Sequence, residues 1–439
     1  MLYHTTLRTP RSLLITMIII SAFSTQAQAQ AQAQDRYLLE KVVEVSRHGV
    51  RPPTESNTIA LESGTARQWP QWVTREGELT GHGYAATVLK GRYEGEYYRQ
   101  QHLFASGCPT EQQIYVLASP LQRTRATAQA YMDGMFPGCG VATHAVEDEK
   151  QDPLFHGDKM GIGTLDPERA KAEVLKAMGG DLDIAYQRLK PSIEQLKQVV
   201  CEAGKPCPVF DKPWANKQDK EGSISISGLN TLANMSEVFL LEYSENLPLA
   251  QVAFGHVRNT QDLVPLMAAM TAKYDFTNDV PYIAQRGGSL FMQQIAQALA
   301  QGTPAEQDTT QGEPPAVPYL LYVAHDTNIA YLRTLLQFHW QLPGDTADNI
   351  PPAGSLVFER WRDTNTQQRF LRIYFQTQSL DQIRSLTPLD DRQPLLKEEF
   401  TSQGCQQTEK GTLCPFDTAL KSMRESIDSS ALAPVHYAL

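Results

Sequence analysis

Apolar runs of strand length recur along the chain, and each ends in a short polar turn. Three of these runs, at residues 38–45, 114–118 and 319–324, are rich in aliphatic residues, and the last two lead directly into segments with helical spacing. Because this pattern predicts repeated strand-loop-helix units, the polar turns should meet at one edge of a sheet, where ligands bind in α/β proteins. Two later runs, at residues 355–361 and 370–377, predict further strands.

Residues 153–284 have a different pattern. Their apolar positions follow helical spacing, the loops between them are rich in glycine and proline, and strand alternation is absent. We interpret this stretch as a mainly helical subdomain inserted into an α/β domain that comprises residues 35–152 and 285–439. The predicted fold class is α/β, with a central mixed sheet flanked by helices.

The first 34 residues are typical of a signal peptide. His4, Arg8 and Arg11 form a basic start, residues 13–23 are apolar but too few to span a bilayer, and the Ala/Gln repeat that follows offers several A-x-A cleavage sites. The sequence therefore predicts export, a periplasmic or secreted location and no stable membrane association after cleavage. An uncleaved membrane anchor is the alternative interpretation.

Charge limits the classes of partner. The chain of 439 residues holds 39 Lys and Arg against 49 Asp and Glu, a formal charge of -10, and removal of residues 1–34 leaves 37 against 49, or -12. An acidic chain is poorly suited to coating nucleic acid, so no nucleic-acid partner is expected. An anionic substrate would need a local cluster of cations that opposes the overall charge.

The six cysteines fit an oxidising compartment. A metal site is the rival interpretation, but the sequence has no C-x-x-C pair and no Cys/His cluster with zinc spacing. We therefore predict three disulfides, each stabilising the fold by roughly 2 to 4 kcal/mol, and no metal. The cysteines fall in couples that are close in sequence, and the simplest connectivity joins each couple: Cys108 with Cys139, Cys201 with Cys207, and Cys405 with Cys414.

The polar turn after the first apolar run carries a concentrated group of functional side chains. Arg47, His48 and Arg51 lie within five positions of one another, and Gly49 allows a tight turn that lets their side chains converge. Two fixed cations beside one imidazole should lower the pKa of His48 and leave one ring nitrogen unprotonated and nucleophilic. The same guanidinium groups could hold a phosphate dianion.

The segment RHGVRPPT, residues 47–54, resembles the R-H-G-x-R-x-P pattern of the histidine acid phosphatases, within the phosphoglycerate-mutase-like superfamily. The stretches WPQW, GELTGHG, LQRT, AHDTN and SLVFERW follow in the order expected for the bacterial periplasmic branch, which contains phytases and glucose-1-phosphatases. This resemblance implies the histidine phosphatase fold and the hydrolysis of phosphate monoesters.

The turn after the second apolar run adds a further cation. Ser119 is a candidate helix N-cap, Pro120 suits the first helical turn, and Arg123 then lies where a cation is unfavourable unless it has an anionic partner. By resemblance, Arg123 is a third phosphate-binding arginine. Ser119 stands where many family members have aspartate, which puts a substrate contact from this position in doubt.

The turn after the third run delivers His325 and Asp326, which match the second motif of the family. The resemblance implies that His48 attacks phosphorus and forms a phosphohistidine, and that Asp326 protonates the leaving alkoxide and then activates water. An unperturbed aspartate has a pKa of about 3.9, which predicts fastest hydrolysis in acid. The phosphoryl oxygens would be bound by Arg47, Arg51, Thr54, Arg123 and His325. Because the arginines supply the positive charge, no cofactor is expected.

Several alternatives stay open. A mutase-like phosphotransferase would use the same phosphohistidine, and a phosphate-binding protein would keep the arginines without turnover; export and disulfides argue against the first, and the complete catalytic set argues against the second. Among hydrolases, Thr54 and AHDTN look like phytases, which act on myo-inositol hexakisphosphate, whereas SPLQRT and the six-cysteine pattern look like glucose-1-phosphatases. We favour a phytase-like or broad acid phosphatase with a small-molecule phosphate monoester as substrate. The lone histidines His156 and His256 are expected to be structural.

Overall fold

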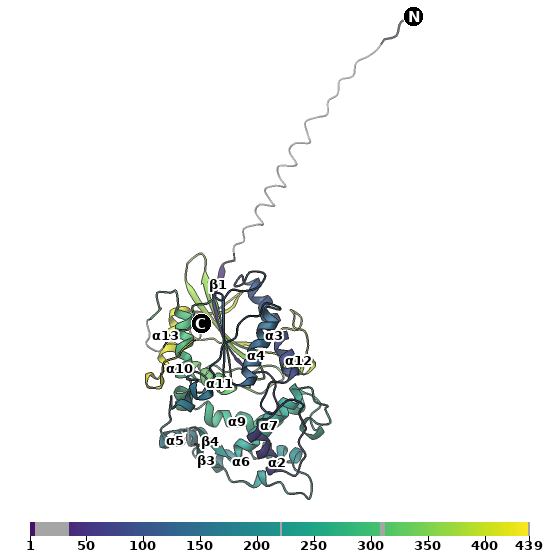
Figure 1. Cartoon of the computed structure of the whole chain (residues 1–439), viewed down its shortest axis with the longest axis vertical. Coiled ribbons are helices and arrows are strands. Elements are labelled where there is room, and N and C mark those ends of the chain that lie inside the picture. The colour runs from purple at the N-terminus through teal and green to yellow at the C-terminus, as the bar shows by residue number, and fades with distance from the viewer. Residues whose placement is uncertain (5–34, 220–221, 308–311, 438–439) are drawn as a thin grey trace.

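The fold is taken from a computed structural model, which describes residues 1–4, 35–219, 222–307 and 312–437 (Figure 1). Except for its first four residues, the predicted signal peptide lies outside this described part. Within the described residues, no helix combines the length and the apolar character needed to cross a membrane.

One mixed sheet forms the centre of the upper part of the molecule in Figure 1. Its strands are β1 (Tyr37–Arg47), β2 (Ile114–Ala118), β5 (Tyr319–Ala324), β6 (Ser355–Asp363), β7 (Arg369–Thr377), β8 (Leu396–Glu399), β9 (Gln406–Thr408) and β10 (Gly411–Pro415). Their order is β2-β5-β1-β6-β7-β10-β9, with β8 paired to β7. β2, β5 and β1 run parallel, whereas β6 lies antiparallel to β1, so the predicted mixed sheet is confirmed.

The three parallel strands end at the same edge of the sheet. Arg47 at the end of β1 lies opposite Ala324 at the end of β5, and Ala118 at the end of β2 lies opposite Val323. The turns that follow these strands therefore begin side by side. This register confirms that the three polar turns converge at one edge.

Helices cover both faces of the sheet (Figure 1). α3 (Gly81–Gln100) and α4 (Gln122–Met135) pack together over one face, where Tyr98, Tyr131 and Trp361 are buried in a shared cluster. The other face is covered by α10 (Pro281–Ala300), α11 (Asp326–Leu336) and α13 (Phe416–Glu425), with Phe291 and Phe358 in the core. Both layers exclude water from the strands, which suits the continuous apolar runs seen in the sequence.

A mainly helical part lies beyond the edge where the three turns converge (Figure 1). It has its own apolar core, in which α7 packs against α9. Its helices are α2 (Glu55–Gly64), α5 (Pro167–Ala177), α6 (Leu182–Val200), α7 (Leu229–Ser244), α8 (Thr260–Leu263) and α9 (Ala268–Lys273), and α9 continues as a π-turn over Tyr274–Asn278. The short 3-10 turns η1 (Glu149–Gln151) and η2 (Gly157–Met160) connect the two parts.

Three details of this part differ from expectation. The stretch 153–284 contains a hairpin of β3 (Ala215–Gln218) and β4 (Ile224–Ser227), which the sequence pattern did not reveal because both strands are short and largely solvent-accessible. α2 lies outside that stretch, and so does α12 (Leu380–Ser385), yet both pack against α7. The division into residues 35–152 with 285–439 and residues 153–284 remains a prediction.

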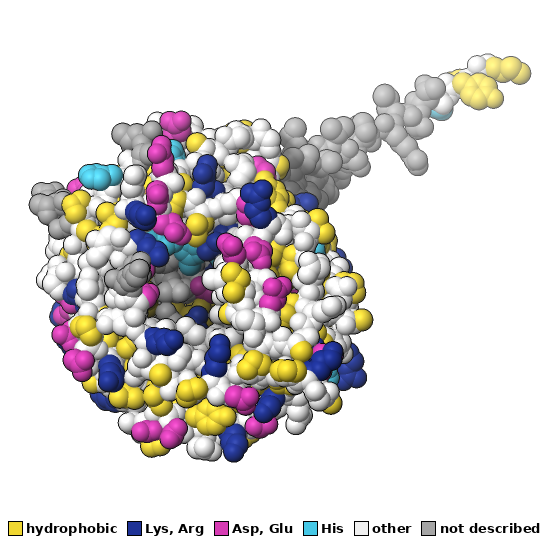
Figure 2. Space-filling view, turned by 60° about the horizontal axis from the view of Figure 1, so that its bottom comes forward, with side chains coloured by type: hydrophobic (Ala, Val, Ile, Leu, Met, Phe, Trp, Pro, Cys, Tyr) yellow, Lys and Arg dark blue, Asp and Glu magenta, His cyan; other side chains and the backbone are white. Residues whose placement is uncertain are grey.

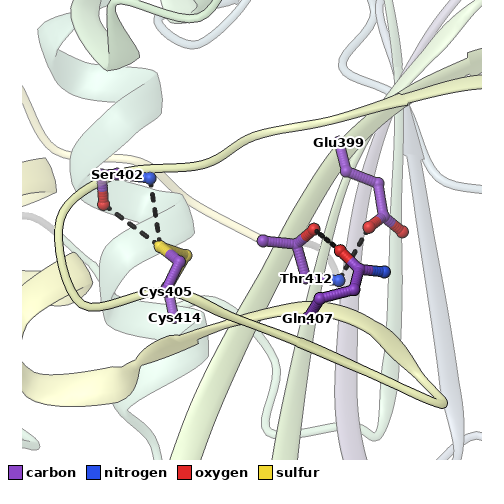
Figure 3. Close-up of a disulfide and its surroundings, with 6 residues drawn as sticks. All are labelled: Glu399, Ser402, Cys405, Gln407, Thr412 and Cys414. Carbon is purple, nitrogen blue, oxygen red and sulfur yellow. Dashed lines mark hydrogen bonds between the residues drawn. A yellow bond between two sulfur atoms is a disulfide. The ribbon is translucent and has the colours of Figure 1, made fainter.

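All three disulfides pair as expected: Cys108 with Cys139, Cys201 with Cys207, and Cys405 with Cys414. The last one ties the segment before β9 to β10, as Figure 3 shows. Beside it, the backbone N–H of Thr412 donates to Glu399 at 2.7 Å, and the Thr412 hydroxyl bonds Gln407 at 2.9 Å. The first contact ties β10 to β8, and the second lies within the β9–β10 hairpin.

Glu242 on α7 is a buried carboxyl with incomplete hydrogen bonding. One carboxyl oxygen accepts the N–H of Ala253 at 2.9 Å, and the other has no partner among the described residues. Burial raises the pKa of Glu242 to about 8, and the single hydrogen bond opposes this only in part. The folded protein therefore favours the neutral acid at this position.

This raised pKa predicts a pH-dependent stability. The stabilisation is present in full below the ordinary carboxyl value of 4.5 and is lost as the pH rises through about 8. Glu242→Gln keeps the size and the acceptor oxygen but does not ionise. We expect the free energy of unfolding, measured with urea, to fall between about pH 4 and pH 9 by about 4 kcal/mol more in the wild type than in the variant. Parallel stability curves for the two proteins would contradict this assignment.

Candidate active site

The turn after β1 is fixed by its neighbours on both sides. The His48 N–H donates to Ala324 at 3.2 Å, the His48 carbonyl accepts the N–H of Ala353 at 3.0 Å, and the Gly49 N–H donates to the Thr127 hydroxyl at 2.9 Å. A Cβ on Gly49 would lie 2.8 Å from a methyl carbon of Leu79. Gly49 has an ordinary negative φ, so close packing rather than the tight turn first expected explains the glycine.

The His48 ring is held in one tautomer. Its Nδ1 lies 2.8 Å from the carbonyl oxygen of Gly49, and because a carbonyl only accepts, Nδ1 carries the hydrogen. Nε2 is therefore left with its lone pair. Burial and the charges of Arg123, Arg47 and Arg51 lower the pKa of His48 well below its usual value. The predicted direction is correct, although burial is a larger cause than like-charge repulsion.

Two arginines of this turn share one carboxylate. Glu237 on α7 accepts from Arg47 at 2.5 Å and from Arg51 at 3.2 Å. Burial alone would raise the pKa of Glu237, but the two guanidinium charges outweigh it and lower that pKa. Arg47 also donates to the Ile350 carbonyl at 2.7 Å, so the guanidinium is fixed on two sides.

The third arginine comes from the first turn of α4, as the sequence predicted. Arg123 donates to the Gly77 carbonyl at 3.3 Å. Burial and the like charge of Arg51 lower the pKa of Arg123 to about 10. The Nε atoms of Arg47, Arg51 and Arg123 are buried and have no partner among the described residues. Three cations with unused donors form a site suited to an anion with several oxygens.

His325 lies directly after β5 and packs against His48, with ring centroids 5.7 Å apart. Its Nε2 is 2.9 Å from the Ser119 hydroxyl, and its backbone N–H donates to the Asn328 side chain at 3.0 Å. Contrary to expectation, Ser119 is not the N-cap of α4, because the helix begins at Gln122 and Leu121 is its N-cap. The Ser119 side chain orients His325 instead.

Asp326 at the start of α11 lies 3.2 Å from Arg47 and accepts a hydrogen bond from Tyr274. Burial would raise the pKa of Asp326, but the charges of Arg47 and Lys273 and the Tyr274 hydrogen bond outweigh it, so the pKa is lowered. The expectation of an unperturbed aspartate is therefore wrong for the free protein. Asp326 is a carboxylate there, even in mild acid.

A cavity of about 420 Å³ opens onto these groups. Figure 2 shows a hollow on this face of the molecule in which histidine side chains are visible, with Lys and Arg side chains around it. The predicted residues that line the cavity are His48, Arg51, Arg123, His325 and Asp326. Arg47 lies behind it and, with Asp326, lines a much smaller neighbouring pocket. Thr54 is the residue before α2, its hydroxyl is 3.3 Å from that of Ser56, and it is not among the lining residues.

Sequence reasoning missed the contribution of the helical part. Glu237, Tyr274 and Lys273 all come from that part: Glu237 pairs with Arg47, and Tyr274 and Lys273 act on Asp326. The sequence did contain a signal for Glu237, because this residue interrupts an apolar stretch on a buried helix. A buried carboxylate needs a cationic partner. His156, expected to be structural, also lines the cavity, whereas His256 does not.

Comparisons with known proteins agree with the geometry. The sequence profile of the histidine phosphatase superfamily (branch 2) matches residues 38–376, so the chain belongs to this family. It is a phosphoric monoester hydrolase of the histidine acid phosphatase type. Among curated proteins, phytase AppA of Escherichia coli is 29% identical, covering 92% of this chain and 94% of the relative. A glucose-1-phosphatase of Salmonella typhimurium is also 29% identical, covering 93% and 97%.

Solved structures point the same way. A phytase of Klebsiella sp. ASR1 superposes with a TM-score of 0.85 and 50% identity, covering 91% of this chain and 98% of that protein. A phytase of Hafnia alvei in complex with tartrate gives a TM-score of 0.81 and 31% identity over 92% of this chain and 100% of that protein. The central sheet and its helices are thus those of the histidine phosphatase fold.

The hydrogen bond between Ser119 and His325 leads to a prediction. Ser119→Ala removes the partner of His325 Nε2 without changing charge, so the ring loses its orientation toward the phosphoryl position. We expect kcat/KM for p-nitrophenyl phosphate to fall by roughly three- to tenfold. Ser63→Ala, on the exposed surface of α2, is the matched control. An unchanged kcat/KM in Ser119→Ala would show that His325 needs no such support.

Proposed function

We propose that this protein is a phytase-like phosphatase, with myo-inositol hexakisphosphate or a similar polyphosphorylated polyol as its preferred substrate. The observation that carries this proposal is the cavity, whose volume of about 420 Å³ leaves room for more than one phosphate and whose lining adds Lys273 to Arg51 and Arg123. Arg286 also lines it but pairs with Asp428 at 3.0 Å, and Glu149 and Asp158 belong to the same lining. In a chain with a formal charge of -10, Lys273 and the two arginines concentrate positive charge at one place, which favours a substrate with several phosphates over a monophosphate.

In the proposed reaction, His48 is the nucleophile. Its unprotonated Nε2 attacks phosphorus, the bond to the leaving alkoxide breaks, and a phosphohistidine forms. Arg51 and Arg123 bind the phosphoryl oxygens from the cavity side, together with His325, and Arg47 does so from behind. Their charge stabilises the transition state electrostatically. Thr54 would join this set only through a movement of the turn before α2.

Asp326 supplies the proton in this proposal. A bound phosphate places negative charge beside Asp326 and takes up part of the Arg47 charge, and both effects raise the lowered carboxyl pKa. The second pKa of a phosphate monoester is about 6, so in acid the substrate arrives as a monoanion and can bring the proton with it. Acidic conditions thus favour the protonated complex. After the alkoxide leaves, the Asp326 carboxylate activates the water that attacks the phosphohistidine.

Glucose-1-phosphatase activity is the second candidate. The chain is as similar to a curated glucose-1-phosphatase as to a curated phytase, at 29% identity in both cases. A periplasmic or secreted location is also proposed, since it rests on the signal-like N-terminus and on the disulfides.

The proposed substrate preference is tested by phosphate release from purified protein. The panel comprises myo-inositol hexakisphosphate, glucose 1-phosphate and p-nitrophenyl phosphate, with the His48→Ala variant as the blank. We expect kcat/KM for the first substrate to exceed that for glucose 1-phosphate by at least about tenfold, since each added charged contact contributes to binding. A preference for glucose 1-phosphate would favour the second candidate.

The role of Asp326 gives a separate prediction. Asp326→Asn keeps the size of the side chain but transfers no proton, so single-turnover phosphorylation by an alkyl phosphate should slow by about 10² to 10⁴-fold. p-Nitrophenyl phosphate should be affected far less in this step, because its leaving group is a stable anion. Asp158→Asn, which lines the same cavity, is the matched control. If both substrates slowed equally, the proton donor would be another residue.

A further inference from the structure

A further histidine faces the cavity beside the phosphoryl position. The ring of His156 lies 5.0 Å from that of His325, and His325 in turn lies 5.7 Å from His48. His156 lines the cavity and its side chain is 13% exposed. The ring of His325 thus contacts both the His48 ring and the His156 ring.

The buried Asp152 orients the His156 ring. Asp152 is 2% exposed, and its Oδ2 accepts from Nδ1 of His156 at 2.8 Å. Its Oδ1 accepts the backbone N–H groups of Leu154 and Phe155 at 3.2 and 3.0 Å. Because Nδ1 is engaged, Nε2 is the atom of His156 that a ligand would meet, although the Glu149 carboxylate lies 3.4 Å from it. A ring with hydrogens on both nitrogens is a cation, and Asp152 is then its counter-ion.

Other charged groups act on this ring. Glu149 on η1 lies 3.4 Å from Nε2, and its side chain is 35% exposed. His325, at the start of α11, carries a pKa lowered by burial and by Arg123, so it is neutral. The remaining charged residues of the cavity are Asp158 on η2, Asp326 on α11 and the cations Arg51, Arg123, Lys273 and Arg286.

We propose that His156, oriented by Asp152, is a specificity-determining residue that binds a second phosphate of the substrate as an imidazolium. This inference rests on the proposed function, because it requires a substrate that carries neighbouring phosphates. A charge-assisted hydrogen bond from Nε2 then strengthens binding of polyphosphorylated substrates and leaves monophosphates unaffected. Selectivity for the former therefore requires a hydrogen on Nε2 as well as on Nδ1, and histidine is the side chain whose protonation ordinarily changes between acid and neutral pH.

The test uses anions that do not titrate. Inorganic sulfate represents one phosphate and myo-inositol hexasulfate represents several, and both remain fully ionised from mild acid to neutrality. Each is measured as an inhibitor of p-nitrophenyl phosphate hydrolysis, and the ratio of the two inhibition constants gives the selectivity. Because the probes do not change charge, the pH dependence of this ratio reports only groups of the protein.

For the wild type, we expect the selectivity for hexasulfate to fall by roughly tenfold between about pH 5 and pH 8. In His156→Asn, the selectivity should be roughly tenfold lower at about pH 5 and should no longer depend on pH, while the sulfate constant changes less than about twofold. His144→Asn is the control, since His144 stacks on Tyr115 and is not among the lining residues of the cavity.

A second variant tests the counter-ion. Asp152→Asn keeps an oxygen for the N–H groups of Leu154 and Phe155 but places an amide opposite Nδ1 of His156. Because the imidazolium then lacks its counter-ion, we expect the selectivity of this variant for hexasulfate over sulfate to be lost at a lower pH than in the wild type.

Two outcomes would overturn the inference. Unchanged selectivity in His156→Asn would show that His156 makes no such contact, and equal weakening of both inhibitors would show that it merely supports His325. Failure of the proposed function is seen separately. In that case the wild type would release no phosphate from myo-inositol hexakisphosphate, whatever the inhibition constants show.

Discussion

Repulsion between three guanidinium groups around one buried imidazole is the constraint on which the site depends. Like charges a few ångströms apart at an effective dielectric constant of about 20 repel by about 4 kcal/mol per pair. Arg47, Arg51 and Arg123 are held together in spite of this, because Glu237 bridges two of them and Asp326 pairs with one. Burial, and with it the residual positive charge, keeps His48 neutral, and the same charge suits the site to an anion.

This balance requires both parts of the molecule. The parallel strands deliver the arginines and histidines to one edge of the sheet, whereas the helical part delivers Glu237, Lys273 and Tyr274 from α7, α9 and the turn that follows. The sheet alone would present cations without their counter-ions. The cavity between these groups then follows from the fold.

Much of this arrangement was predictable from the sequence, because strands buried on both faces leave long apolar runs and the RHGVRPPT and HD motifs follow directly after them. The register that brings Arg47, Arg123 and His325 together follows from parallel strand order. The short hairpin β3–β4 and the packing of α2 against α7 were not predictable, since both depend on tertiary contacts that leave weak local patterns. The lowered pKa of Asp326 was missed for the same reason: its causes, Arg47 and Lys273, are distant in sequence.

The central claim is that His48 attacks phosphorus through Nε2, because Nδ1 donates to the Gly49 carbonyl. The most direct measurement is a rapid alkaline quench during turnover of p-nitrophenyl phosphate, followed by peptide mapping and identification of the phosphorylated ring nitrogen by NMR. The account predicts an acid-labile phosphoryl group on Nε2 of His48. A phosphoryl group on Nδ1, on another residue, or on no residue of the protein would contradict it.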